Sequence, residues 1–184
     1  MLEEINKEIR LATTLLLPDY KEMKHLLGYD REDPDSIVFE KMERSMNKVL
    51  EVCKPCALYS VFPIKEEVDG LDLGFAKVVS KDLSRKLKGC HHLIVVGLTI
   101  GSEVDRLIQR ASRLNPSEGY VLQAAGAACA ERFANDVNDL LKEEYKDYVL
   151  KPRYSCGYGD FDLKHQRDIF KAMPKFSSTG LTLM

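Results

Sequence analysis

The stretch at residues 117–145 constrains the fold most, because its hydrophobic residues recur at helical spacing and predict the longest helix of the chain. Its core face is expected to consist of Val121, Ala125, Cys129, Phe133, Val137 and Leu140 or Leu141. A neighbouring face carries Ala124, Ala128, Glu131 and Asn135. Small side chains there would let a ligand or another backbone come close, which makes Glu131 a candidate binding residue. An ordinary surface glutamate is the alternative interpretation.

The remaining pattern alternates between helices and strands. Helices are expected at residues 2–16, at 37–52 after an N-cap at Ser36, from Ser80 or Asp82 to about Gly89, at 102–114 with Ser102 as cap, and at 163–172 with Asp162 as cap. Strands are expected at residues 57–64, 71–79 and 91–98, and a final strand is expected to begin at 181–184. The charged stretch at residues 65–70 indicates that the first two strands form a hairpin or pair with each other.

This alternation lacks regular β-α-β units and predicts an α+β fold in which a mostly antiparallel sheet packs with helices. A chain of 184 residues can bury a substantial core. The expectation is one domain over residues 1–184, with residues 1–52 as a helical N-terminal part.

Charge and hydropathy argue against two classes of partner. The balance of 27 basic and 29 acidic residues gives no electrostatic case for binding nucleic acid or an anionic membrane. The apolar run at residues 15–17 stops at Pro18, far short of a membrane span, and the first residues lack the basic region of a signal peptide. The protein is therefore expected in the cytoplasm.

The five cysteines are odd in number and irregularly spaced, which favours reduced thiols over a disulfide framework. Cys53 and Cys56 have the spacing of a thioredoxin motif, but they are expected to follow a helix and precede a strand, whereas the redox motif opens a helix. A zinc site would need a second pair of ligands, for which the Cys90-His91-His92 run is the nearby candidate. The two histidines are better explained as strand residues, so no metal site is predicted.

The run at residues 153–160, Arg-Tyr-Ser-Cys-Gly-Tyr-Gly-Asp, has the composition of a binding loop. Gly157 and Gly159 permit positive φ angles and close approach of a ligand to the main chain. Arg153 offers a planar fork suited to a carboxylate, and the rings of Tyr154 and Tyr158 could stack on a heterocycle. A solvent-exposed turn between two helices is the alternative interpretation.

The pattern Arg-x-x-x-Gly-Tyr-Gly-Asp, followed by Leu163, Gln166 and Phe170, resembles the signature of the activation domain of cobalamin-dependent methionine synthase and of related free-standing corrinoid-protein activators. Residues 95–106 resemble the strand, glycine turn and helix start of that family. Residues 124–133 resemble its long alanine-rich helix, which carries a glutamate. The resemblance is strongest over residues 90–184.

The resemblance implies a specific activity. An activation domain binds S-adenosylmethionine over the corrin ring of a cobalamin held by a partner, and a flavodoxin-like protein supplies an electron. Cob(II)alamin is thereby methylated reductively, with the protein supplying placement. The implied role is a stand-alone reactivation component of a methyltransferase system in methionine biosynthesis, active only with a cobalamin-binding methionine synthase or another corrinoid protein.

The resemblance also assigns roles to residues of this chain. Arg153 would hold the methionine carboxylate, and Glu131 would face the ammonium group or another polar part of the ligand. Ser155 and Gly157 would hydrogen-bond the adenine or ribose through backbone groups. Tyr158, the candidate catalytic residue, would lie between ligand and corrin.

The chain departs from the family pattern at several places. Cys156 stands where the family often has proline, and the acidic ligand contact in the family's N-terminal half has no evident counterpart. Family members also usually continue beyond the last residue of this sequence. The alternative function is therefore a non-catalytic docking module that caps a corrinoid protein. A Rossmann-type methyltransferase is disfavoured, since no early strand leads into a Gly-x-Gly-x-Gly loop.

Overall fold

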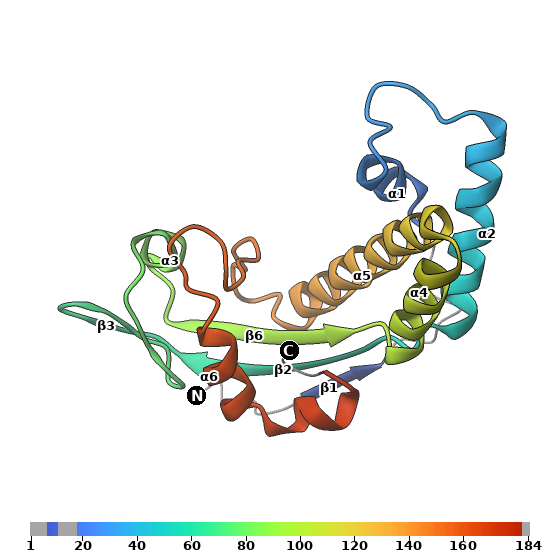
Figure 1. The fold of residues 1–184 in the computed structure, drawn as a ribbon. Helices are drawn as coiled ribbons and strands as arrows, with labels where there is room; N and C mark the ends of the chain where they lie inside the picture. The colour runs from blue at the N-terminus through green and yellow to red at the C-terminus, as the bar shows by residue number, and fades with distance from the viewer. Residues whose placement is uncertain (1–6, 11–17, 182–184) are drawn as a thin grey trace. The chain divides into compact units, whose positions relative to one another are not determined.

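The computed structural model describes residues 7–10 and 18–181 (Figure 1). These residues form an α+β structure with antiparallel sheets, which confirms the predicted fold class. The chain divides into two compact units. The sheet unit comprises the described residues of Met1–Ile9, Ala57–Gly97 and Lys142–Met184, and the helical unit those of Arg10–Cys56 and Leu98–Leu141. That residues 1–184 act as one domain with a helical N-terminal part stays a prediction.

Two small sheets provide the framework of the sheet unit. The first has the order β1 (Lys7–Arg10), β2 (Cys56–Pro63) and β6 (His92–Thr99), and Figure 1 shows neighbouring strands running in opposite directions. The second has the order β3 (Lys65–Glu67), β4 (Gly70–Asp72) and β5 (Lys77–Val78), all antiparallel. Leu71 is the central residue of the second sheet, paired with Glu66 on one side and Val78 on the other.

Each sheet has its own hydrophobic cluster within this unit. Beside β3–β5, the helix α3 (Lys81–Leu87) contributes to a buried cluster of Leu71, Leu73, Val78, Leu83 and Phe161. Beside β2 and β6, the helix α6 (His165–Ala172) leads into the 3₁₀ helix η2 (Pro174–Thr179). There the buried cluster consists of Leu58, Val95, Met173 and Phe176.

The helical unit is built around α5 (Pro116–Glu144), a helix of 29 residues that confirms the long helix expected from the sequence. The other helices are α1 (Tyr20–Leu26), α2 (Ser36–Val52) and α4 (Ser102–Leu114). Cys129 of α5 contacts the sulfur of Met46 on α2 at 3.5 Å, and Lys48 of α2 pairs with Glu118 at 2.6 Å. Among the described residues, no helix is long and apolar enough to cross a membrane.

The helix predicted for residues 2–16 is wrong where the structure describes it. Residues 7–10 form β1 at one edge of the first sheet, and the rest of that range lies outside the described residues. Four residues are too few to distinguish the hydrophobic repeat of a helix from that of a strand. Pairing with a neighbouring strand therefore decides which structure residues 7–10 adopt. The strand expected to begin at residues 181–184 lies outside the described residues except for Leu181, which is not in a strand.

The pairing predicted for residues 57–64 with 71–79 is also wrong. The first run is β2, whereas the second contributes β4 and β5 to the other sheet. The hairpin is formed by β3 and β4: β3 lies inside the stretch expected to be a connection, and β4 begins at the last residue of that stretch, Gly70. Gly70 permits the close approach of β5 to β4, because a Cβ there would overlap the carbonyl oxygen of Val78.

The helix caps agree with the sequence at one position and differ at three, one of which is Asp162, since α6 begins only at His165, after Lys164, and has no side-chain cap. Ser80 caps α3 as expected, with its hydroxyl accepting from the backbone N–H of Leu83 at 3.0 Å. The cap of α2 is Asp35 rather than Ser36, and α4 follows Gly101 without a side-chain cap. The sequence reasoning missed α1, whose signal is the N-cap Asp19 directly after a proline.

We expect Gly97→Ala to destabilise the protein, by roughly 1–3 kcal/mol. A Cβ at this position in β6 would lie 2.5 Å from Cζ of Phe176, a ring that is buried in the cluster beside β2 and β6. Chemical denaturation of the variant and the wild type measures the difference in free energy of unfolding.

Gly126→Ala is the matched control. Its Cβ would lie 3.3 Å from methyl groups of Ile108 and Val104, and alanine is favoured over glycine inside a helix by about 0.5–1 kcal/mol. We expect this variant to stay within about 1 kcal/mol of the wild type. Equal stability of both alanine variants would contradict the packing described for β6 and η2.

Candidate functional site

The run at residues 153–160 forms a compact loop in the sheet unit, between α5 and α6. Gly157 and Gly159 have φ angles of 93° and 55°, so both use the left-handed region expected of glycine. The N–H of Gly157 donates to the carbonyl of Phe161 at 2.7 Å, and the N–H of Phe161 donates to the carbonyl of Tyr158 at 3.0 Å. The N–H of Tyr158 donates to the carbonyl of Ser155 at 3.3 Å. The loop backbone is thus folded on itself.

The two tyrosines of the loop have different environments. The ring of Tyr154 is stacked on Phe161, with centroids 6.4 Å apart and planes at 14°, and Nζ of Lys86 lies over the Tyr154 ring at 5.8 Å. Tyr158 is 65% exposed. Of the two rings expected to stack on a heterocycle, Tyr154 is engaged in packing and Tyr158 offers an open surface.

The loop also exposes polar groups on both sides of Gly157. Arg153 and Ser155 are solvent exposed. Within the described part of the chain, the Ser155 hydroxyl and the Gly157 carbonyl make no hydrogen bond, whereas the Gly157 N–H and the Ser155 carbonyl are used inside the loop. The loop thus presents one hydroxyl and one carbonyl, beside the exposed guanidinium of Arg153. They suit a ligand that carries both donors and a carboxylate.

Glu131, the fifth predicted site residue, belongs to the helical unit and is exposed on α5. The small side chains of Ala124 and Ala128 were expected to let a ligand or another backbone come close, and both residues are buried in the core of their unit. Their small side chains allow close helix packing, so they do not mark a ligand surface. Arg153, Ser155, Gly157 and Tyr158 share one loop, and assembly of Glu131 with that loop stays a prediction.

The cysteines do not form a reactive pair. Cys53 directly follows α2 and Cys56 begins β2, which confirms the order of helix, cysteine pair and strand. Burial raises the pKa of the Cys53 thiol to about 11, and burial raises that of Cys129 to about 12. Cys156, in the loop, also has a raised pKa because of burial. Raised thiol pKa values oppose thiolate formation and do not support redox catalysis at these positions.

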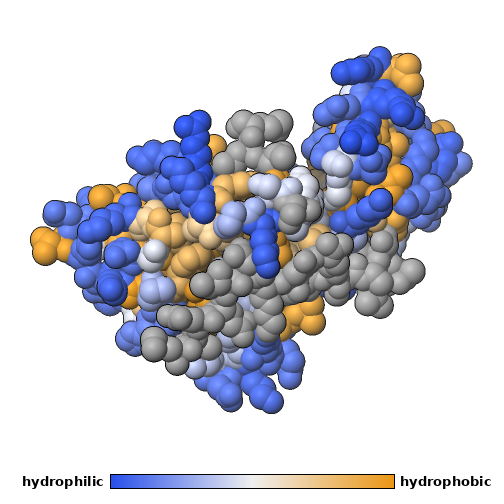
Figure 2. Space-filling view, turned by 90° about the horizontal axis from the view of Figure 1, so that it is seen from below, coloured by the Kyte–Doolittle hydropathy of each residue, from blue (hydrophilic) through white to orange (hydrophobic). Residues whose placement is uncertain are grey.

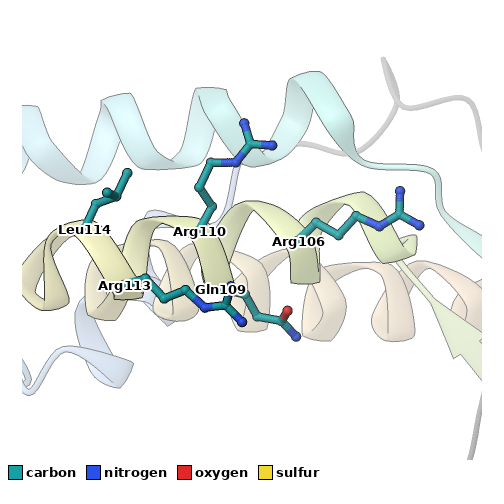
Figure 3. Close-up of a pocket in the computed structure, with 5 residues that line it drawn as sticks. All are labelled: Arg106, Gln109, Arg110, Arg113 and Leu114. Atoms are coloured by element: carbon teal, nitrogen blue, oxygen red, sulfur yellow. The ribbon is translucent and has the colours of Figure 1, made fainter.

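No group of three or more His, Cys, Asp or Glu side chains in residues 7–10 and 18–181 is arranged to hold a metal ion. Figure 3 shows an open pocket on one helix, α4, where Arg110 points toward α2; the lining residues are Arg106, Gln109, Arg110, Arg113 and Leu114. None of these is a predicted site residue. The charges of α4 fit its helix dipole, with acidic Glu103 and Asp105 in the first turn and basic residues toward the end. The basic character of the pocket is thus explained without a ligand.

Exposed hydrophobic side chains are dispersed rather than gathered at one site. On the face shown in Figure 2, hydrophobic areas are separated by hydrophilic ones. The most exposed large hydrophobic residues include Val68, between β3 and β4, and Val149, in the segment that follows α5. Single exposed residues of this kind are common on protein surfaces and identify no binding face by themselves.

No family model and no curated protein matches this sequence. Among solved structures, the chain is similar to the MetH reactivation domain bound to AdoHcy, with a TM-score of 0.69 and 14% sequence identity. The superposition covers 97% of this chain and 73% of the other. The likeness confirms that the chain has the fold expected from the resemblance to methionine synthase activation domains.

The raised pKa values predict slow alkylation of the buried thiols. At pH 8, a thiol with a pKa of about 11 is thiolate in roughly one molecule in a thousand, so iodoacetamide should modify Cys53 and Cys129 much more slowly than the partly exposed Cys90. Peptide mass spectrometry after timed quenching measures each site. The denatured protein is the control, in which all three should react alike. Rapid alkylation of Cys53 in the folded protein would revive the redox interpretation.

Proposed function

We propose that this protein is a cytoplasmic, S-adenosylmethionine-binding reactivation component of a cobalamin-dependent methionine synthase or a related corrinoid methyltransferase. The observation that carries the proposal is the loop at residues 153–160. Its backbone is bonded internally while Arg153, Ser155 and Tyr158 face solvent, in a chain with the fold of the MetH reactivation domain. That domain is bound to AdoHcy, which is S-adenosylmethionine without its transferred methyl group.

The proposed reaction balances without a general acid or a nucleophile from this chain. Cob(II)alamin on the partner takes one electron from a flavodoxin-like donor, and the sulfonium carbon–sulfur bond of S-adenosylmethionine breaks as a cobalt–carbon bond forms. The products are methylcobalamin and AdoHcy. The protein contributes by positioning the reactants, since holding the methyl group in line with the cobalt lowers the entropic cost of reaching the reactive geometry.

Each exposed group of the loop has a proposed partner on the ligand. The Arg153 guanidinium binds the methionine carboxylate in a charge-assisted, bidentate contact. The Ser155 hydroxyl and the Gly157 carbonyl bind the adenine or ribose, which offers both acceptors and donors. Glu131 is proposed to face the ammonium group or another polar part of the ligand. A carboxylate and a guanidinium are the complements that a zwitterionic amino-acid end requires.

Tyr158 is the proposed contact between ligand and corrin. Its ring is 65% exposed, and its backbone is fixed by the bonds of its N–H and carbonyl within the loop. A flat ring held in this way can limit the directions from which the sulfonium methyl approaches the cobalt. Its effect is therefore on orientation more than on affinity.

We predict that Arg153→Ala weakens binding of S-adenosylmethionine roughly tenfold or more, because a charge-assisted contact is worth about 1.5–3 kcal/mol. Isothermal calorimetry with the corrinoid partner present measures the affinity. Arg132→Ala is the control, since Arg132 is paired with Asp136 along α5 at 3.0 Å and has no proposed contact with the ligand. Absence of binding by the wild type would favour the alternative, a docking module that caps a corrinoid protein without using the ligand.

We predict that Tyr158→Ala slows methylcobalamin formation and leaves ligand affinity within a few fold, as expected for a lost orienting group. The assay contains the corrinoid partner, a reductant and S-adenosylmethionine, and the cobalamin absorbance spectrum reports the product. Tyr148→Ala removes another exposed tyrosine, 56% accessible, and should have no effect. An unchanged rate for Tyr158→Ala would show that another residue faces the corrin.

A further inference from the structure

The carboxylate of Asp160, the last residue of the loop, is bound to the beginning of α3. One oxygen accepts from the Ser80 hydroxyl and from the N–H of Asp82 at 3.1 Å. The other oxygen accepts from the N–H of Lys81 at 2.7 Å. A carboxylate is well suited to this place, because the first N–H groups of a helix have no partner within the helix.

The contact is reciprocal. The N–H of Asp160 donates to Oδ2 of Asp82 at 3.3 Å, and Oδ1 of Asp82 pairs with Arg85 on the same helix. Gly159 crosses the helix so closely that a Cβ would overlap Oδ2 of Asp82 and lie 2.7 Å from Oη of Tyr154. The glycine is thus required by the approach of the loop to α3 and by its φ of 55°.

Tyr154 connects the two ends of the loop. Its hydroxyl donates to the carbonyl of Tyr158 at 2.9 Å, while its ring stacks on the buried Phe161. The carbonyl of Tyr158 therefore accepts two hydrogen bonds, from Tyr154 and from the N–H of Phe161. These contacts hold the backbone of Tyr158 from inside the protein and leave its side chain exposed.

We propose that Asp160 is a positioning residue, which sets the shape of the loop before the ligand arrives by anchoring it to α3, with Tyr154 as a second support. Neither side chain touches the ligand. The part that concerns ligand affinity rests on the proposed function, and the part that concerns loop order does not. A loop ordered in advance loses less conformational entropy when it binds.

The ionisation of Asp160 agrees with this anchoring. Its hydrogen bond from Ser80, followed by those from backbone N–H groups, lowers the pKa of the carboxyl below its usual value. Because this pKa is lower in the folded protein than in the unfolded chain, the ionised carboxylate stabilises the folded state at pH values above the unfolded pKa. That stabilisation is lost as the pH falls through the pKa of the folded state. Asp160 is therefore a carboxylate at neutral pH.

The test combines hydrogen exchange with ligand affinity. Asp160→Asn should speed exchange of the N–H groups of Gly157 and Phe161 at least tenfold in the free protein, measured by NMR, since the anchor loses its charge. It should also weaken S-adenosylmethionine binding at least tenfold by calorimetry with the corrinoid partner present. Tyr154→Phe keeps the stacked ring and loses one hydrogen bond, so about a threefold to fivefold effect on both measurements is expected.

Two controls separate positioning from general stability. Asp69→Asn makes the same charge change at an exposed residue between β3 and β4 and should alter neither measurement. Val95→Ala removes buried volume in the cluster beside β2 and β6. It should lower the melting temperature but leave N–H exchange in the loop and the affinity for S-adenosylmethionine within twofold of the wild type.

Unchanged exchange in Asp160→Asn would overturn the proposal. Faster exchange with unchanged affinity, in a protein that binds the ligand, would overturn the link between loop order and binding. A wild type that binds no S-adenosylmethionine would refute the proposed function, and the exchange rates would still decide whether Asp160 orders the loop.

Discussion

The burial of Phe161 is the interaction on which the loop at residues 153–160 depends. Its ring belongs to the hydrophobic cluster shared by β4, β5 and α3, and it is stacked with both Tyr154 and His165. Its N–H and carbonyl are bonded to Tyr158 and Gly157. One residue therefore joins the core of the sheet unit to the turn that carries the exposed groups. Displacing this ring would cost the loop both its hydrophobic support and its backbone bonds.

A loop supported in this way separates shape from recognition. Three residues maintain its shape: Asp160 binds the beginning of α3, Phe161 packs in the core, and the Tyr154 hydroxyl donates to the carbonyl of Tyr158 inside the loop. The residues that carry the proposed contacts, Arg153 and Tyr158, point to solvent. Substitutions among the second set can change a ligand preference without unfolding the loop, whereas changes in the first set alter the geometry of every contact at once.

The sequence predicts local features of this chain well and long-range features poorly. The helix α5, the Ser80 cap of α3 and the glycine turns at 157 and 159 depend on neighbouring residues, and all were expected. The assignment of residues 7–10 to a strand depends on a partner strand that no local pattern specifies. Likewise, Ser80 and Asp160 are 80 positions apart, and a single sequence contains no information on that pairing. The sequence left open whether Ala124 and Ala128 lie against another backbone or a ligand, because a face of small residues suits both, and their burial in the core favours the first.

The chemistry proposed for this fold explains why rigidity would matter more than reactivity. Methyl transfer from a sulfonium to a reduced cobalt needs no proton transfer by the protein, so no side chain with an activated nucleophile is required. What the reaction requires is alignment, and errors of an ångström in the position of the methyl group are costly. The loop suits a reaction that requires alignment, because its backbone is hydrogen-bonded at Gly157, Tyr158 and Phe161. Asp160 also binds it to α3, so neutral and acidic groups alone maintain its shape. The thiol of Cys156 is partly buried and its pKa is raised by that burial, which opposes formation of a thiolate in this loop.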